Sequence, residues 1–325
     1  MTVTTATQPA ISVIIPAYNE ERYIGRCLDA LLPQVREMTA AGVPCEVLVV
    51  DNGSTDGTRA LCESRGIPVH SAPQLRVGAV RNRGASIARG RLLAFLDADC
   101  VPGDGWLTAA VGSQEIEPCL TGSTYALPKD AHWIEAAWFA TEDGGRRPAT
   151  HINAGNLIIP ATTYRSIGGF DESLASGEDF ELAQRARSVV PVVSDDRIRV
   201  VHLGYPKTLR RFVQREIWHG LGALASARHD WRDKPLIGTL VFALSLLGTV
   251  VGVAAGAAGK GWSIAVASAS TLIFLLLATV EYRTRLRHGL LLRAQLLVLY
   301  ALFYAGRTVA LARLVFGNTR YVRSK

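Results

Sequence analysis

Residues 92–100 read LLAFLDADC, an apolar run that ends in two carboxylates, Asp97 and Asp99, one residue apart. An uninterrupted run of leucine, alanine and phenylalanine predicts a strand buried on both faces of a parallel sheet. Open α/β sheets bind ligands at the carboxyl ends of their strands, and hard divalent cations prefer carboxylate oxygens. The pair therefore suggests a metal site for a diphosphate. The alternative is that both aspartates simply begin a turn, because Pro102-Gly103-Asp104-Gly105 follows.

Two further apolar strands are predicted upstream, at residues 11–15 and 46–50. Asn19 is predicted to cap a helix whose apolar side chains fall on one face. Residues 77–88 are predicted to form a second helix, which ends before Gly90. This order of strand, helix, strand, helix, strand predicts βαβ units and an α/β fold with a mostly parallel sheet and flanking helices.

Polar residues follow each of the three predicted strands, at residues 16–20, 51–56 and 97–99. Because the carboxyl ends of parallel strands meet at one edge of a sheet, these segments are expected to converge there. Convergence of three polar strand ends favours a nucleotide pocket over three unrelated turns.

Composition separates the chain of 325 residues into two parts. Residues 1–233 carry 24 basic and 27 acidic residues, whereas residues 234–325 carry 11 basic residues and one acidic residue. The N-terminal part is therefore not expected to bind nucleic acid. Five cysteines without a CxxC pair suit reduced thiols better than a disulfide framework. Residues 1–10 lack a signal-peptide pattern and are expected to be disordered.

The C-terminal part, residues 234–325, has the character of a membrane region. Residues 236–258 and 262–280 contain no charged side chain, and each is long enough to cross a hydrocarbon core of ~30 Å as a helix. The second of these is followed by EYRTRLRH, whose basic residues place that loop, and with it the N-terminal domain, on the cytoplasmic face. Residues 289–316 are interrupted by three arginines, which leaves an interfacial helix, a re-entrant helix or a third span open.

Four segments together resemble a family 2 glycosyltransferase of the GT-A fold, which is Rossmann-like. They are VIIPAYNEERYIGRCLDALL, EVLVVDNGSTDGT, GAVRNRGASIARGRLLAFLDADCVP and GGFDESLASGEDFELAQRAR. The resemblance covers roughly residues 11–220, and its specificity lies in the order and spacing of the four segments. It implies a catalytic domain at residues 11–233 that binds a nucleotide-diphosphate sugar with Mg²⁺ or Mn²⁺.

The resemblance also implies roles for individual residues. Asp99 would bind the metal, and Asp179 would be the general base. The residues implied to bind the nucleotide sugar are Pro16, Ala17, Tyr18, Glu20, Asp51, Arg81, Asn82 and Asp97. Asp179 also begins a predicted helix at residues 178–187, whose N-terminal dipole favours an ionised carboxylate. On its own, the acidic pair Glu178-Asp179 is equally typical of the first turn of any helix.

Weaker predictions concern the metal and the acceptor. His202 follows an apolar strand at residues 198–201 and is either a second metal ligand, as in some family members, or a structural histidine. Gln214 and Trp218 resemble the QxxRW element of processive relatives, but Ile217 stands where that element has arginine, which favours a single transfer. Asn156 and Glu178 are further candidates for the acceptor side.

These observations predict a multi-pass enzyme of the cytoplasmic membrane with its catalytic domain on the cytoplasmic face. It would be an inverting, metal-dependent glycosyltransferase that moves one sugar to a lipid, a lipid-linked glycan or a polyprenyl phosphate. Two alternatives from other classes remain open. One is a sugar-nucleotidyltransferase, although PAYNEER replaces the glycine-rich loop expected after its first strand. The other is a membrane scaffold that binds nucleotide without catalysis.

Overall fold

The structure is a computed structural model that describes residues 8–140, 144–226, 234–259, 262, 269 and 290–315. Its contacts divide the chain into two compact units. The first unit comprises Met1–Asp130 and Ala140–Tyr205, and the second comprises Ala131–Phe139 and Pro206–Lys325. The predicted disorder of residues 1–10 and the predicted span at 262–280 lie outside the described residues, apart from positions 8–10, 262 and 269.

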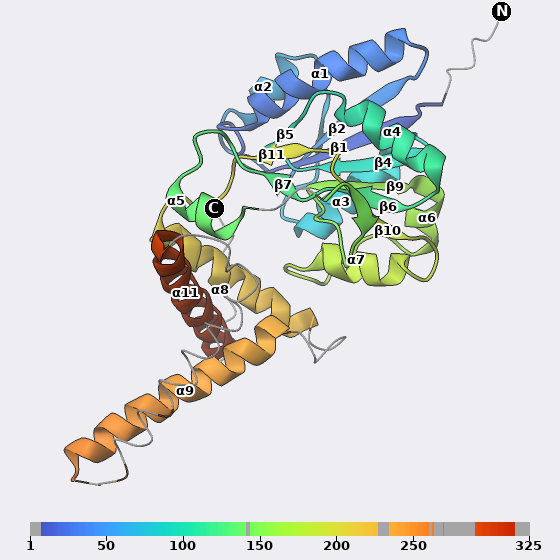
Figure 1. Cartoon of the computed structure of the whole chain (residues 1–325). Coiled ribbons are helices and arrows are strands. Elements are labelled where there is room, and N and C mark those ends of the chain that lie inside the picture. Colours follow the sequence, from blue (N-terminus) through green and yellow to red (C-terminus); the bar gives the residue numbers. More distant parts are fainter. Residues whose placement is uncertain are drawn as a thin grey trace, which may run out of the picture. The chain divides into compact units, whose positions relative to one another are not determined.

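The first unit is built on an eight-stranded sheet in the order β3-β2-β1-β4-β9-β6-β10-β8 (Figure 1). Strands β1 to β4 pair in parallel, and β9 pairs antiparallel with both β4 and β6. A smaller sheet has the order β5-β11-β7. The strands are β1 Ile11–Ala17, β2 Cys45–Asp51, β3 Val69–Ser71, β4 Leu92–Leu96, β5 Cys100–Pro102, β6 Leu120–Gly122, β7 Tyr125–Ala126, β8 Arg146–Pro148, β9 Asn156–Pro160, β10 Val192–Asp195 and β11 Val200–His202.

Helices cover both faces of the large sheet, as Figure 1 shows. In this unit they are α1 Ile24–Ala40, α2 Thr58–Glu63, α3 Val77–Ile87, α4 Trp106–Ile116, α6 Ala161–Ser166 and α7 Glu178–Ala186. Alternate residues of β4 belong to different cores: Leu93 and Phe95 to one, Ala94 and Leu96 to the other. The prediction that this strand is buried on both faces is confirmed, and the α/β class with it. The parallel arrangement ends at β4, however, because β9 runs the other way.

The predicted cap of the first helix is wrong. Helix α1 begins at Ile24, and its N-cap residue is Tyr23. Asn19 lies before this position in the left-handed conformation (φ 54°), and its side-chain oxygen accepts a hydrogen bond from the Thr55 amide at 2.9 Å. Asn19 therefore ties the turn after β1 to the turn after β2, since its side chain is too far from the first helical turn to cap it.

The second unit is helical and consists, in its described part, of α5 Trp133–Trp138, α8 Leu209–Ser226, α9 Lys234–Ala257 and α11 Leu290–Val315. Helix α5 stands between β7 and β8 in the sequence but packs with the C-terminal helices. The ring of Trp138 lies 5.2 Å from that of Phe212 and 4.7 Å from that of Tyr300. Two helices are long and apolar enough to cross a membrane, at Leu236–Ala257 and Leu291–Arg313.

Candidate active site

The three polar strand ends lie at one edge of the sheet. β1 pairs with β2 on one side and with β4 on the other, in parallel, and Ala17 stands opposite Asp51. Pro16 and Ala17 are the last residues of β1, and Asp97 follows β4 directly. The predicted convergence of these segments is confirmed, because neighbouring parallel strands bring their carboxyl ends together.

The turns after β1 and β2 fasten each other. The carboxylate of Asp51, which is 3 % exposed, accepts hydrogen bonds from the amides of Gly53 and Ser54. Glu20 is 8 % exposed, and its amide donates to the Thr58 hydroxyl at 2.7 Å. Tyr18 is half-buried in the same turn. The nucleotide contacts assigned to these residues stay predictions.

Arg81 joins two acidic segments that are far apart in the sequence. Its two terminal nitrogens each lie 2.7 Å from a carboxylate, one of Asp97 and one of Glu178. The guanidinium also lies over the Phe170 ring, 5.5 Å from its centre. Burial alone would lower the pKa of Arg81, but the two carboxylates outweigh it and raise that pKa. What the structure shows for Arg81 is therefore a bridge between Asp97 and Glu178, and its direct contact with a nucleotide stays a prediction.

Asn82 fastens the loop that leads to α7. Its amide nitrogen donates to the Phe170 carbonyl at 2.9 Å and to Glu172 at 2.8 Å, and its oxygen accepts from the Phe170 amide and the Tyr164 hydroxyl. Four hydrogen bonds use the full bonding capacity of this side chain. Asn82 therefore holds the loop before Glu178, and the nucleotide contact assigned to it stays a prediction.

Glu178 and Asp179 open α7, as predicted. Asp179 is half-buried, and its two oxygens accept hydrogen bonds from the amides of Phe180 (2.8 Å) and Ala154 (3.3 Å). Glu178 is 7 % exposed, and burial together with the charge of Asp179 raises its pKa, with Arg81 opposing that rise. The helix start thus presents one buried carboxylate, bound to arginine, and one that is partly open.

Asp99 and His202 form the candidate metal site. Asp99 Oδ1 lies 3.7 Å from His202 Nε2, and one ligand atom from each of Asp99, Cys100 and His202 lie within 4.8 Å of one another. His202 Nδ1 is buried with no hydrogen-bond partner among the described residues. Burial and the charge of Asp97 raise the pKa of Asp99, and His202 opposes that rise. A divalent cation would offset this cost, so the pair fits a hard cation such as Mg²⁺ or Mn²⁺.

Cys100 is a poor third ligand for such a cation. Its side chain is fully buried, and burial raises its pKa well above the usual range, so the sulfur stays a thiol. Neutral sulfur is a soft donor, whereas Mg²⁺ and Mn²⁺ prefer oxygen ligands.

Two glycines allow the two aspartates to lie close against the backbone. A Cβ on Gly155 would lie 2.3 Å from Asp97 Oδ2 and 2.5 Å from the Tyr125 hydroxyl, and one on Gly204 would lie 2.0 Å from Asp99 Oδ2. The Tyr125 ring is stacked on His202 at 4.9 Å. Sequence reasoning missed these residues: a glycine just before Asn156 and one two residues after His202 were weak signals, and nothing local marked Tyr125.

The acceptor-side role predicted for Asn156 does not hold. Its side chain is fully buried, donates to the Ile198 carbonyl at 2.8 Å and accepts from the Trp106 indole at 2.9 Å. It therefore links β9 to the core. Gln214 and Trp218 lie on α8 in the second unit, where Gln214 is exposed and Trp218 is half-buried. Their assignment to the acceptor side stays a prediction.

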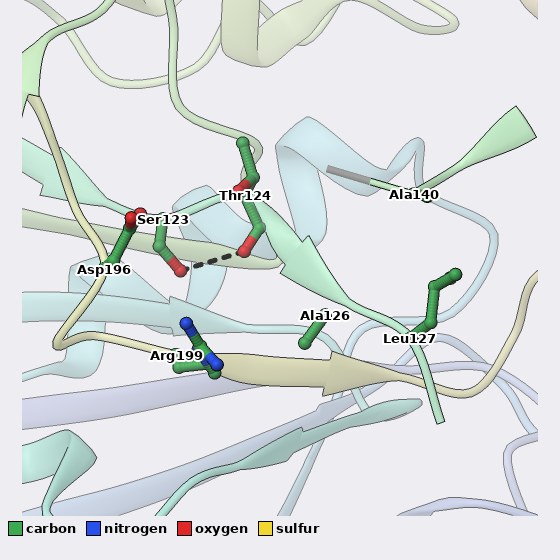
Figure 2. Close-up of a pocket in the computed structure, with 7 residues that line it drawn as sticks. All are labelled: Ser123, Thr124, Ala126, Leu127, Ala140, Asp196 and Arg199. Carbon is green, nitrogen blue, oxygen red and sulfur yellow. Dashed lines mark hydrogen bonds between the residues drawn. The ribbon is translucent and has the colours of Figure 1, made fainter. Parts of the chain in front are cut away.

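A cavity of about 320 Å³ also lies in the first unit (Figure 2). It is lined by Ser123, Thr124, Ala126, Leu127, Ala140, Asp196 and Arg199. Asp196 accepts the Gly145 amide at 2.8 Å, and the Ser123 hydroxyl bonds to the carbonyls of Ile198 and Thr124. No predicted site residue lines this cavity, and these polar groups serve the fold.

Parallel strands that end in buried carboxylates beside an Asp–His pair define a ligand-binding α/β domain. Residues 12–164 match the sequence model of "Glycosyl transferase family 2". The first unit therefore carries a family 2 glycosyltransferase domain with the GT-A fold.

Similar proteins agree with this assignment. Glycosyltransferase AglE of Haloferax volcanii is 30 % identical over 194 residues, which are 56 % of this chain and 62 % of that protein. The pre-mycofactocin glycosyltransferase of Mycobacterium tuberculosis is 25 % identical over 250 residues, 70 % of this chain and 50 % of that protein. The chain thus spans about half to three fifths of these relatives. The mannosyltransferase PcManGT from Pyrobaculum calidifontis shares the fold, with a TM-score of 0.57, 17 % identity, and coverage of 96 % of this chain and 88 % of that one.

Proposed function

We propose that this chain is a membrane-anchored, inverting glycosyltransferase. It transfers one sugar from a nucleotide-diphosphate sugar to a lipid, a lipid-linked glycan or a polyprenyl phosphate. The observation that carries the proposal is the partly buried Asp99–His202 pair next to Asp97, at the edge where three neighbouring parallel strands end. Gly155 and Gly204 lack a Cβ, which lets the carboxylates of Asp97 and Asp99 lie close against the backbone there.

Asp99 and His202 would hold the cation, either Mg²⁺ or Mn²⁺, which supplies positive charge to the departing diphosphate. Asp97 lies two residues before Asp99, and Arg81 fixes its carboxylate on one side. The Asp97 carboxylate would therefore be held in a fixed position in which it contacts the ribose or the sugar. The relative PcManGT is described in complex with GDP-Man and Mn²⁺, which agrees with a donor and metal of this kind.

Asp179 would act as the general base. Its carboxylate is partly open and is oriented by two backbone amides, so one oxygen can receive a proton from an acceptor hydroxyl. The Glu178–Arg81–Asp97 bridge joins the base segment to the donor segment. Attack by the activated hydroxyl on the anomeric carbon, opposite the diphosphate, inverts that centre.

The acceptor is proposed to lie in or at the membrane. Helices α9 and α11 have the length and composition of membrane helices, which supports a lipid or lipid-linked acceptor. A catalytic domain at residues 11–233 and a membrane region at 234–325 would place the active site at the cytoplasmic face of the cytoplasmic membrane. Ile217 in place of arginine before Trp218 supports a single transfer.

Membranes that contain the chain should transfer label from a panel of nucleotide sugars into lipid extracts. Asp99→Ala should lower the rate at least about 100-fold, because the metal contributes several kcal/mol to transition-state stabilisation. Asp104→Ala, on the exposed turn that follows, is the matched control and should keep the rate. Equal transfer by both variants would contradict the metal role. Release of pyrophosphate instead of nucleoside diphosphate would point to a nucleotidyltransferase.

A further inference from the structure

Helices α8 and α11 lie side by side in the second unit (Figure 1), and their backbones approach closely. A Cβ on Gly306 would lie 3.1 Å from Glu216 Cβ, and one on Gly220 would lie 2.8 Å from Ala310 Cβ. The two glycines are thus required by the contact. The relative direction of the two helices also follows, because Phe212 clusters with Leu299 while Gly220, further along α8, contacts Ala310, further along α11. The helices therefore run parallel over about 16 Å.

A buried ion pair fixes this contact. Glu216 on α8 is 1 % exposed and lies 3.5 Å from Arg307 Nε on α11 and 2.8 Å from a terminal nitrogen of Arg215. A buried carboxylate is tolerated only with such partners. α8 and α11 therefore stay together wherever α11 lies.

The outer faces of the two helices differ in polarity. On α11, Leu291, Val298 and Val309 are exposed by 73 %, 47 % and 42 %, and their spacings of 7 and 11 residues place them on one face. At 3.6 residues per turn, Tyr300 and Tyr304 lie roughly opposite this face, and both are buried. On α8, by contrast, the exposed residues include Arg210, Arg211 and Gln214.

A transmembrane α11 would carry this part of α8 into the bilayer. The segment of α11 beside α8 belongs to the apolar stretch Leu291–Arg313, so Arg210 and Arg211 would lie exposed at hydrocarbon depth. Exposed arginines are strongly disfavoured there. In the plane of the interface, the same arginines reach lipid phosphates while the apolar face of α11 contacts acyl chains. A single unbroken helix also excludes a re-entrant path.

We infer that α11 lies along the membrane surface and does not cross it. Its face Leu291–Val298–Val309 rests on the acyl chains, and α8 presents Arg210 and Arg211 to anionic headgroups. This inference rests on the membrane part of the proposed function. It is independent of which sugar or acceptor is used.

Labelling from one side of the membrane tests directly whether α11 crosses it. Ala294→Cys and Ala312→Cys, at exposed positions near the two ends of α11 and outside the lipid-facing row Leu291–Val298–Val309, are made separately and exposed to a membrane-impermeant maleimide in sealed vesicles. The unmodified chain is the background, since four of its five cysteines are buried. Both positions should react from the same side, the one on which Asp104→Cys reacts. Reaction of one position only after detergent is added overturns the inference.

A second measurement tests lipid contact. A spin label at Val298→Cys should be relaxed by dissolved oxygen and protected from a polar nickel complex, whereas a label at Gln214→Cys on α8 should show the reverse. Equal exposure of both labels to the nickel complex overturns lipid contact. If a carbonate wash removes the full chain from membranes, the membrane anchor of the proposed function fails, whereas a surface position of α11 is supported. Transfer in the labelled-sugar assay still reports separately on catalysis.

Discussion

Arg81 in the first unit and Arg307 in the second are packed in similar ways, but the charges around them are balanced in opposite directions. Each side chain is largely buried, lies over a phenylalanine ring and binds a carboxylate from another helix. Arg81 pairs with Asp97 and Glu178, and the charges of Asp99 and Asp179 also act there. In the second unit the ratio is reversed, since Arg215 and Arg307 both pair with the single carboxylate of Glu216.

The difference in charge indicates which kind of ligand each unit suits. Among the described residues, the edge around Arg81 has more carboxylates than cations, which suits a divalent cation. Around Glu216 positive charge is in excess: burial and the charges of Arg215 and Arg307 lower the pKa of His219 well below its usual range. A basic, partly apolar unit suits a lipid surface with phosphates.

The largest effect is expected on the rate of sugar transfer, from a substitution at the acidic site of the first unit. Asp179→Asn keeps the shape of the side chain but cannot accept the acceptor's proton, so kcat for a hydroxyl acceptor should fall about 10²- to 10⁴-fold. The measurement is the initial rate of sugar transfer into lipid extracts, with Asp104→Asn as control. A near-normal rate would mean that the acceptor is already ionised, as a phosphate is, or that Asp179 is not the base.

Arg81→Met should strongly destabilise the first unit. It leaves Asp97 and Glu178 buried or half-buried without their cation, and breaking a buried ion pair in this way costs about 3–5 kcal/mol. Urea denaturation of the detergent-solubilised chain measures the loss of unfolding free energy. Arg83→Met, exposed on the same helix, should cost less than about 0.5 kcal/mol. Equal stability of the two variants would refute the bridging role of Arg81.

Arg307→Met should cost less than Arg81→Met, about 1–3 kcal/mol, because Glu216 keeps Arg215 as a partner. The same denaturation assay applies, with Arg211→Met on the exposed face of α8 as the control. A loss as large as that of Arg81→Met would show that Arg215 does not compensate and that the two centres are equally dependent on one cation.

The smallest effect is a pH dependence of the stability lost in Arg81→Met, which arises from the pKa of Glu178. The pKa of Glu178 is raised in the folded protein, so the folded state holds its proton more firmly than the unfolded chain, and this contribution to stability is lost as pH rises. Without Arg81, which opposes this shift, the pKa of Glu178 is raised further. The stability deficit of Arg81→Met should therefore shrink between pH 8 and pH 5, by about 1.4 kcal/mol for each unit of added pKa shift. Parallel pH profiles of this variant and the unmodified chain would contradict the assignment.

Local sequence was a good guide to the edge of the sheet at which β1, β2 and β4 end. The apolar runs of β1, β2 and β4 are found where they were predicted, and their polar ends meet because the strands are neighbours. Asn19 and Asn156 were misjudged for one reason: an asparagine serves equally well in a cap, a turn or a buried network, and its neighbours in sequence do not decide between them. Asn82 illustrates the same point with its four partners, which come from segments about 80 to 90 residues away.

The sequence by itself determined the class of the fold, the acidic strand ends and the apolar C-terminal helices, because hydrophobic periodicity and strand-end chemistry are local properties. Only the tertiary structure decided that Arg81 bridges Asp97 and Glu178, that the two aspartates lie against Gly155 and Gly204, and that α5 packs with the C-terminal helices. It also decided that Glu216 binds α8 to α11. These contacts join residues far apart in the chain, and they depend on strand order and helix packing, which no short stretch of sequence specifies.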